Sequence, residues 1–281
     1  MNALYSIMDT LLPFEWLSPL FMKNAFLAVL IAGPMFGLLG TSVVSNRMSF
    51  FSDAIGHSAL TGIALGVLLG IPDVTVSMVL FSLVFGFSII TVKIKGKASS
   101  DTIIGVFSSA AVALGIVLLS SGGNFSKYQK YLVGDILSIR PRELLLLAVC
   151  AAVLLAVWVL FYNKMILTSL HCAFAKSRGI RTFFVEQLFA AVTAAIVTVS
   201  IRWTGLLVIN SMLVLPAAAA RMVSRTARQY TAVSSLLSLA CAIAGLCFSY
   251  YTDSASGAAI VLVNTAAFLC CLAVSIARRN S

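Results

Sequence analysis

The sequence carries very little charge for its length. Of its 281 residues only 10% are charged, and aspartate and glutamate together number 9. Hydrophobic residues make up 60% of the chain, and the mean hydropathy is +1.05, which lies outside the range of soluble globular domains. These values exclude a soluble protein. They indicate an integral membrane protein along the whole chain, with no soluble domain left over.

Sequence signatures of common catalytic sites are also lacking. There is no GxxxxGK[S/T] loop to bind nucleotide phosphates, and Ser121-Gly122-Gly123-Asn124 is only a glycine-rich lookalike. No HExxH or GxSxG arrangement occurs either. The six cysteines form no CxxC pair, and five lie in apolar runs, so we interpret them as packing residues. We therefore expect a chain that is not an enzyme and cannot hydrolyse ATP by itself.

Apolar segments recur along the chain, each near the roughly 20 residues that a helix needs to cross ~30 Å of hydrocarbon. They predict an all-α fold, a polytopic bundle of about nine transmembrane helices that forms a single domain over residues 1–281. The Gly33-Pro34 pair predicts a break or kink in the first helix. The expected spans are residues 20–45, 52–71, 73–92, 102–120, 143–163, 184–201, 205–222, 230–250 and 257–277.

Lysine and arginine are concentrated in the segments that follow the third, fifth, seventh and ninth expected spans. With nine spans, four basic clusters fall on one side, which predicts an external N-terminus and a cytoplasmic C-terminus. The segment SGGNFSKYQKYLVGDIL falls on the other side and is expected to fold partly back into the membrane. We interpret the net charge of +10 as basic loops facing anionic lipid rather than as a nucleic-acid surface. The clusters are Lys93, Lys95 and Lys97; Lys164, Lys176, Arg178 and Arg181; Arg221, Arg225 and Arg228; and Arg278 with Arg279.

Two ionisable residues stand at the start of the second span, in the stretch SDAIGHSALTGIALG. Asp53 and His57 are four positions apart, so on a helix they share one face and can direct a carboxylate oxygen and an imidazole nitrogen to one spot. These are half of the ligands of a divalent-metal site. A helix-capping role for Ser52 or Asp53 and a histidine satisfied by a neighbouring carbonyl remain open alternatives. Ionisable residues within spans usually face a cavity or a pathway, which favours the metal site.

Glycines follow the pair at every fourth position. Gly62, Gly66 and Gly70 predict a face on which another helix can pack closely. If that helix belongs to a second copy, a homodimer would place two aspartates and two histidines around a twofold axis.

These residues resemble the permease subunits of bacterial manganese, zinc and ferrous-iron ABC importers. SDAIGH with SALTGIALG is similar to that family's S-D-A-x-x-H-x-x-x-x-G element, although Thr61 replaces a frequent proline and Gly56 a frequent serine. The resemblance implies a permease dimer in the bacterial cytoplasmic membrane, with a separate ATPase and an external metal-binding protein. It implies that Asp53 and His57 bind the transported ion and that no cofactor is permanently bound. Further similar segments are YLVGDIL, GLLVINSMLVLPAAAARM and SYYTDSASGAAIVLV.

The expected cytoplasmic loop from Lys164 to Thr182 contains CAFAKSRGI, which resembles the helix-then-glycine element that docks such permeases on their ATPase. Phe174 and Ala175 would offer its apolar face, and Gly179 would end the helix in a left-handed conformation. The sequence departs from the family just before this element, at His171-Cys172-Ala173, where relatives often carry acidic residues. We interpret His171 as a surface residue of the loop.

Two other functions remain open on the sequence. One is an ion-driven secondary carrier that uses Asp53 and His57 as a proton relay, and the other is a permease for a larger metal chelate. The docking element favours an ATP-driven importer over the first, and the Asp53 and His57 pair favours a bare cation over the second. Oxygen and nitrogen ligands together suit manganese, zinc and ferrous iron alike.

Overall fold

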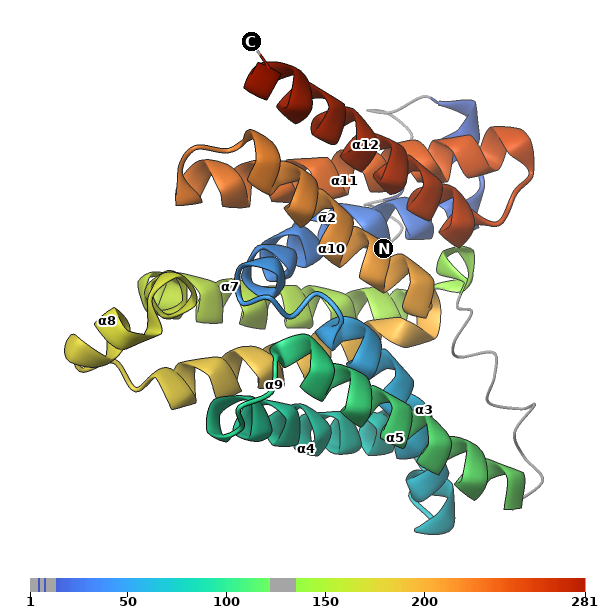
Figure 1. Ribbon diagram of the computed structural model, residues 1–281. Coiled ribbons are helices and arrows are strands. Elements are labelled where there is room, and N and C mark those ends of the chain that lie inside the picture. The colour runs from blue at the N-terminus through green and yellow to red at the C-terminus, as the bar shows by residue number, and fades with distance from the viewer. Residues whose placement is uncertain (1–4, 6–7, 9–13, 122–134, 281) are drawn as a thin grey trace. The chain divides into compact units, whose positions relative to one another are not determined.

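The computed structural model describes Tyr5, Met8 and residues 14–121 and 135–280, and every regular element among these residues is helical. Nine of the helices are long and apolar enough to cross a membrane, which confirms the predicted number of spans (Figure 1). The predicted re-entrant segment lies mostly outside the described residues. The nine helices are α2 (Leu20–Ser45), α3 (Phe51–Leu68), α4 (Val74–Lys95), α5 (Ser100–Ser121), α7 (Pro141–Leu170), α9 (Thr182–Thr204), α10 (Leu206–Val223), α11 (Ala227–Thr252) and α12 (Ser256–Asn280).

Helix α2 is more continuous, and helix α7 longer, than the sequence predicted. The sequence predicted a break or a kink at Gly33-Pro34; a break does not occur, because α2 runs through Pro34 without interruption, and the kink stays a prediction. A proline removes one backbone hydrogen bond, and membrane helices accommodate that loss by local adjustment. The expected cytoplasmic loop from Lys164 is shorter than predicted, since α7 continues to Leu170. A polar residue such as Lys164 can mark the edge of an apolar segment without ending the helix.

The first of two compact units combines most of α2, the first half of α7 and helices α10 to α12. In this unit α10, α11 and α12 pack on one another. The backbones of α2 and α11 also approach closely, since a Cβ atom at Gly37 would lie 2.6 Å from the Ser235 Cα. The Ser234 hydroxyl donates a hydrogen bond of 2.8 Å to the Gly37 carbonyl. Small residues thus let membrane helices pack by backbone approach, as is typical of helices that associate in a bilayer.

The second unit combines α3, α4, α5, the second half of α7, the short helix α8 (Cys172–Ser177) and α9. Here α3 packs against both α4 and α5 (Figure 1). The buried Thr61 hydroxyl donates to the Ala111 carbonyl of α5, and the Ser58 and Ser82 hydroxyls lie 3.4 Å apart between α3 and α4. With 72% of its residues buried inside the chain, α3 is the most enclosed of the candidate spans among the described residues.

The glycine face of α3 packs within the chain, which corrects the expectation that it packs against a second copy. A Cβ atom at Gly62 would lie 2.9 Å from the Met78 Cα of α4, and one at Gly66 would overlap the Ser77 side chain. Gly70 lies beyond the end of α3 with a φ of +68° and no atom near its missing Cβ. Its role is therefore to turn the chain after α3, where a left-handed conformation favours glycine.

We expect Gly62→Ala to destabilise the protein by roughly 1–3 kcal/mol. The added methyl group would meet the Met78 Cα, and a backbone atom cannot give way unless α4 shifts. Gly105→Ala is the matched control, because a Cβ at Gly105 in α5 would meet nothing within 4 Å and alanine favours a helix. Thermal unfolding of the two purified variants in detergent compares them. Equal melting temperatures would contradict close packing of α3 on α4.

Candidate metal centre and docking helix

Asp53 lies inside the first turn of α3 and does not cap it. The helix begins at Phe51, its N-cap position is Phe50, and no side chain makes a capping hydrogen bond there. The capping interpretation of Ser52 or Asp53 is therefore wrong. A carboxylate in the first turn is nevertheless favoured by the positive end of the helix dipole.

The Asp53 and His57 side chains occupy the open side of an otherwise buried helix. His57 Nε2 lies 3.6 Å from Asp53 Oδ2, and the two side chains are 32% and 38% exposed, respectively. In contrast, Ser52 and Ser58 on the same helix are fully buried. A charged or polar group facing hydrocarbon is costly in a span. The open side of α3 is thus suited to a water-filled pathway or to another polypeptide.

The spacing of the pair fits joint binding of one metal ion. Oxygen and nitrogen ligands bind transition-metal ions at about 2.1 Å, so two ligand atoms of one ion lie at most about 4.2 Å apart. The 3.6 Å between the Asp53 oxygen and the His57 nitrogen falls within that limit. Among the described residues, no group of three or more His, Cys, Asp or Glu side chains gathers at one place. By itself the pair offers two ligand atoms, one oxygen and one nitrogen.

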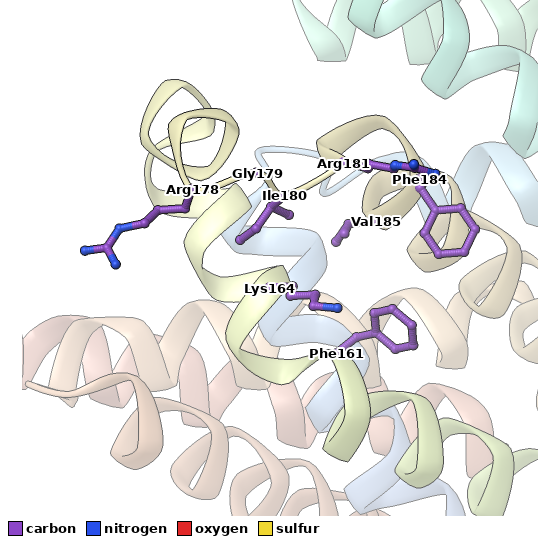
Figure 2. A pocket seen from close by; sticks show the side chains of 8 residues that line it. All are labelled: Phe161, Lys164, Arg178, Gly179, Ile180, Arg181, Phe184 and Val185. Carbon is purple, nitrogen blue, oxygen red and sulfur yellow. The ribbon is translucent and has the colours of Figure 1, made fainter.

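The short helix α8 has the form expected of the docking element. It spans Cys172–Ser177, and the chain leaves it through Gly179, whose φ of +74° confirms the predicted left-handed conformation (Figure 2). The Gly179 N–H donates to the Lys176 carbonyl at 3.0 Å, and the Ile180 N–H donates to the Ala175 carbonyl at 3.1 Å. These two bonds form a Schellman motif, which ends the helix sharply and fixes its exit.

The two apolar residues predicted for the docking face behave differently. Phe174 is 47% exposed, and its ring lies 5.2 Å from the Arg178 guanidinium. Ala175 is fully buried, so it cannot contact a partner and instead holds α8 to the chain. His171 is exposed at the N-cap position of α8, in agreement with its interpretation as a surface residue.

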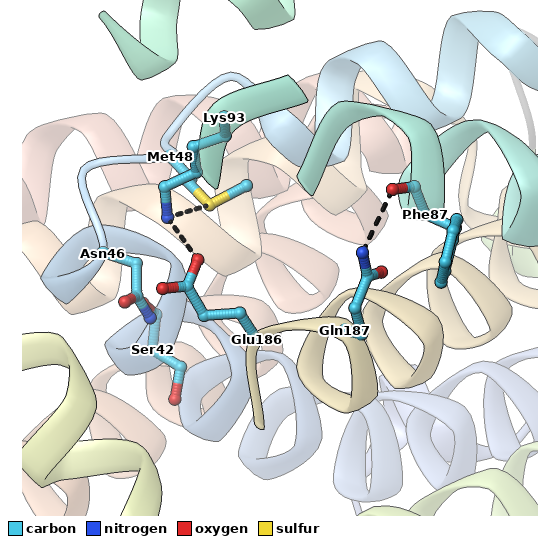
Figure 3. A network of polar contacts seen from close by, with 7 residues as sticks. All are labelled: Ser42, Asn46, Met48, Phe87, Lys93, Glu186 and Gln187. Atoms are coloured by element: carbon cyan, nitrogen blue, oxygen red, sulfur yellow. Dashed lines mark hydrogen bonds and ion pairs between the residues drawn. The ribbon is translucent and has the colours of Figure 1, made fainter. Parts of the chain in front are cut away.

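An ion pair near the start of α3 was not evident from the sequence. Lys93 Nζ at the end of α4 lies 2.9 Å from Glu186 Oε2 on α9, and the two side chains are only 17% and 14% exposed. The same ammonium group donates to Met48 Sδ at 3.4 Å (Figure 3). The Met48 carbonyl in turn accepts a 2.9 Å hydrogen bond from the N–H of Phe51, the first residue of α3. This network fixes the turn before α3 relative to α4 and α9.

The chain is similar in sequence to membrane subunits of bacterial metal transport systems. The sequence profile of the ABC 3 transport family matches residues 19–275. The manganese import system permease protein ScaB of Streptococcus gordonii is 30% identical over 251 residues, 89% of both chains. The high-affinity zinc uptake system membrane protein ZnuB of Haemophilus influenzae is 28% identical over 257 residues, 91% of this chain and 96% of the relative.

The fold is also similar to that of a solved transporter. The structure of PsaBC from Streptococcus pneumoniae in complex with Fab aligns with a TM-score of 0.78 and 26% sequence identity. The alignment covers 96% of this chain and 95% of the chain it matches. The similarity therefore extends over nearly the whole molecule.

Proposed function

Because the chain belongs to the ABC 3 transport family, we propose that it imports a divalent transition-metal ion, manganese, zinc or iron(II), through a pathway that includes Asp53 and His57. It is a multi-pass protein of the bacterial cytoplasmic membrane and a transport subunit. The energy would come from ATP hydrolysis by a separate chain, and an external binding protein would deliver the ion. The relatives named for manganese and zinc transport support these two ions, and iron(II) rests on the ligand chemistry of the pair.

The observation that carries the proposal is the placement of the Asp53 and His57 pair. These side chains lie on the open side of the most enclosed span, at a separation that allows both to bind one ion. An ion that enters the membrane loses water, and oxygen and nitrogen ligands replace it. A hydrophobic substrate would gain nothing from such a pair. The geometry thus favours a bare cation over a large chelate.

A second copy of the chain would complete the ligand set. The pair supplies one oxygen and one nitrogen ligand, whereas transition-metal sites generally use four or more ligands. Two copies related by a twofold axis that passes near α3 would supply two aspartates and two histidines. The half-exposed state of both side chains supports this arrangement. Alternating access would then open the site to one side of the membrane at a time.

The ATPase partner would dock on α8. This helix is short and firmly capped, its Ala175 side is held by the chain, and its Phe174 side is exposed. A rigid helix with an exposed aromatic side chain suits a protein contact, because aromatic anchors supply much of the energy of such interfaces.

Metal-dependent ATP hydrolysis tests the proposed function. The tagged full-length chain is purified with its ATPase, reconstituted in proteoliposomes and supplied with manganese, zinc or iron(II). We expect ATP-dependent uptake of at least one of these ions and faster hydrolysis in its presence. Uptake that proceeds without ATP and follows an imposed proton gradient would contradict the proposal and indicate a secondary carrier.

We expect Phe174→Glu to abolish ATP-driven uptake while the protein still inserts in the membrane. The new carboxylate would stand on the exposed side of α8, where it would have to be desolvated in the contact with the ATPase. Cys172→Glu adds the same charge at another exposed position of α8 and is the matched control. Copurification of the ATPase and uptake are measured in parallel. Normal uptake by the Phe174 variant would exclude this side of α8 from the contact.

A further inference from the structure

A cavity of about 470 Å³ lies in the second unit beside the end of α8 (Figure 2). Neither Asp53 nor His57 lines it. Its walls come from the C-terminal part of α7, the turn after α8 and the first turn of α9. Three of its lining side chains are cationic, Lys164, Arg178 and Arg181, and two are aromatic, Phe161 and Phe184. No acidic side chain lines it.

In the part of the chain that the structure describes, no carboxylate neutralises the cations of this cavity. Neither Lys164 nor Arg181 has a carboxylate within ion-pair distance among the described residues. Figure 2 shows the Arg178 side chain pointing away from the other lining side chains. Lys164 and Arg181 are therefore the two charges that make the cavity attractive to an anion.

The aromatic wall of the cavity lies next to exposed apolar side chains of two candidate spans, α7 and α9. The Phe161 and Phe184 rings are 6.4 Å apart, and Lys164 Nζ lies 5.2 Å from the Phe161 ring. Phe184 is 55% exposed, and Leu160, next to Phe161 in sequence, is 72% exposed. Both belong to membrane-spanning helices. Cationic side chains next to aromatic and aliphatic side chains are typical of protein surfaces at the membrane interface, where lipid headgroups meet acyl chains.

We propose that this cavity binds an anionic phospholipid of the cytoplasmic leaflet, with its phosphate between Lys164 and Arg181. The glycerol and the first acyl carbons would lie against Phe161 and Phe184. Basic cavities between spans on the cytoplasmic side suit anionic headgroups, and the positive end of the α9 dipole adds to the attraction. A lipid fits better than an acidic segment of the ATPase because one wall of the cavity is aromatic and lies next to exposed apolar side chains of the candidate spans, where acyl chains can pack.

This site goes beyond the proposed transport function and has a structural consequence. The turn that ends α8 runs through Gly179 and Ile180, and both line the cavity. A bound lipid would therefore contact the turn that holds the docking helix. The lipid composition of the membrane would then affect how firmly α8 is positioned.

Native mass spectrometry of the purified full-length protein tests the site, with titrations of dioleoyl phosphatidylglycerol and dioleoyl phosphatidylcholine. We expect the protein to bind phosphatidylglycerol more tightly than phosphatidylcholine. The affinity for phosphatidylglycerol should fall by about tenfold or more in the Lys164→Gln/Arg181→Gln variant. Lys95→Gln/Lys97→Gln is the matched control. It removes the same charge from exposed residues outside the cavity and should bind as the unmodified protein does.

Three results would overturn the proposal. Equal weakening in both double variants would mean that net surface charge alone attracts the lipid. Displacement of phosphatidylglycerol by inorganic phosphate would mean that the cavity binds the free anion rather than a lipid. A Lys164→Gln/Arg181→Gln variant that keeps its lipid but no longer copurifies with the ATPase would reassign the cavity to the docking partner.

Discussion

Asp53→Asn should lower metal uptake by roughly a hundredfold or more without preventing insertion or folding. Even the loss of a residue that only supports a metal ligand typically costs about 10–100-fold in affinity or activity, so the loss of a charged ligand should cost at least as much. Asparagine keeps the shape of the side chain and removes its negative charge. Because Asp53 is 38% exposed and makes no N-cap, the fold depends little on that charge.

The same experiment includes a second ligand variant and a control. His57→Ala removes the nitrogen ligand and should reduce uptake to a similar degree, since both ligands act on one ion. Asp73→Asn is the matched control, because Asp73 is an exposed N-cap of α4 and asparagine caps a helix equally well. Uptake of radioactive metal by proteoliposomes compares the variants at equal protein content. Normal uptake by both Asp53→Asn and His57→Ala would remove the pair from the pathway.

Lys93→Met should destabilise the protein by roughly 2 kcal/mol, less than the cost of breaking a fully buried ion pair, because the Lys93–Glu186 pair is partly exposed. The substitution leaves the Glu186 carboxylate, only 14% exposed, without its 2.9 Å partner. The charge would have to stay buried or take up a proton, and either change costs free energy. The effect should also reach the turn before α3, since Lys93 contacts Met48 there.

A double variant separates the charge effect from the loss of packing. Lys93→Met/Glu186→Leu removes both charges and replaces them with apolar side chains, so it should recover most of the lost stability. Thermal unfolding in detergent measures both variants. If the double variant recovers none of the lost stability, the unpaired Glu186 charge is not the cause of the loss, and the contact with Met48, which is absent from both variants, becomes the better explanation.

The sequence predicted the helices well because apolar length is a local property. The span expected at residues 73–92 is the observed α4, Val74–Lys95, and the one expected at 205–222 is α10, Leu206–Val223. The largest error is at α7, predicted to end at residue 163 and observed to end at Leu170. The end of an apolar segment shows where the hydrocarbon ends, whereas the helix continues as long as its hydrogen bonds do.

The exposure and the long-range contacts of the candidate site could not be predicted from the sequence. The spacing of Asp53 and His57 placed them on one helix face, but only the packing of the chain shows that this face is open. Similarly, Gly62 and Gly66 correctly predicted a face for close helix packing, but the helix that packs there is α4 of the same chain and not a helix of a second copy. A pattern of small residues does not specify which helix approaches. Lys93 and Glu186 are 93 residues apart, and no spacing rule connects such positions.

The metal stoichiometry of the purified protein tests most directly whether two copies of the chain share one metal site. The protein is equilibrated with manganese or zinc, freed of unbound metal and analysed for metal and protein content, with its mass measured in parallel. We expect one tightly bound ion per two chains in a dimer, and the loss of this ion in both Asp53→Asn and His57→Ala. One ion per chain in a monomer, or bound metal unchanged in the two variants, would contradict this expectation.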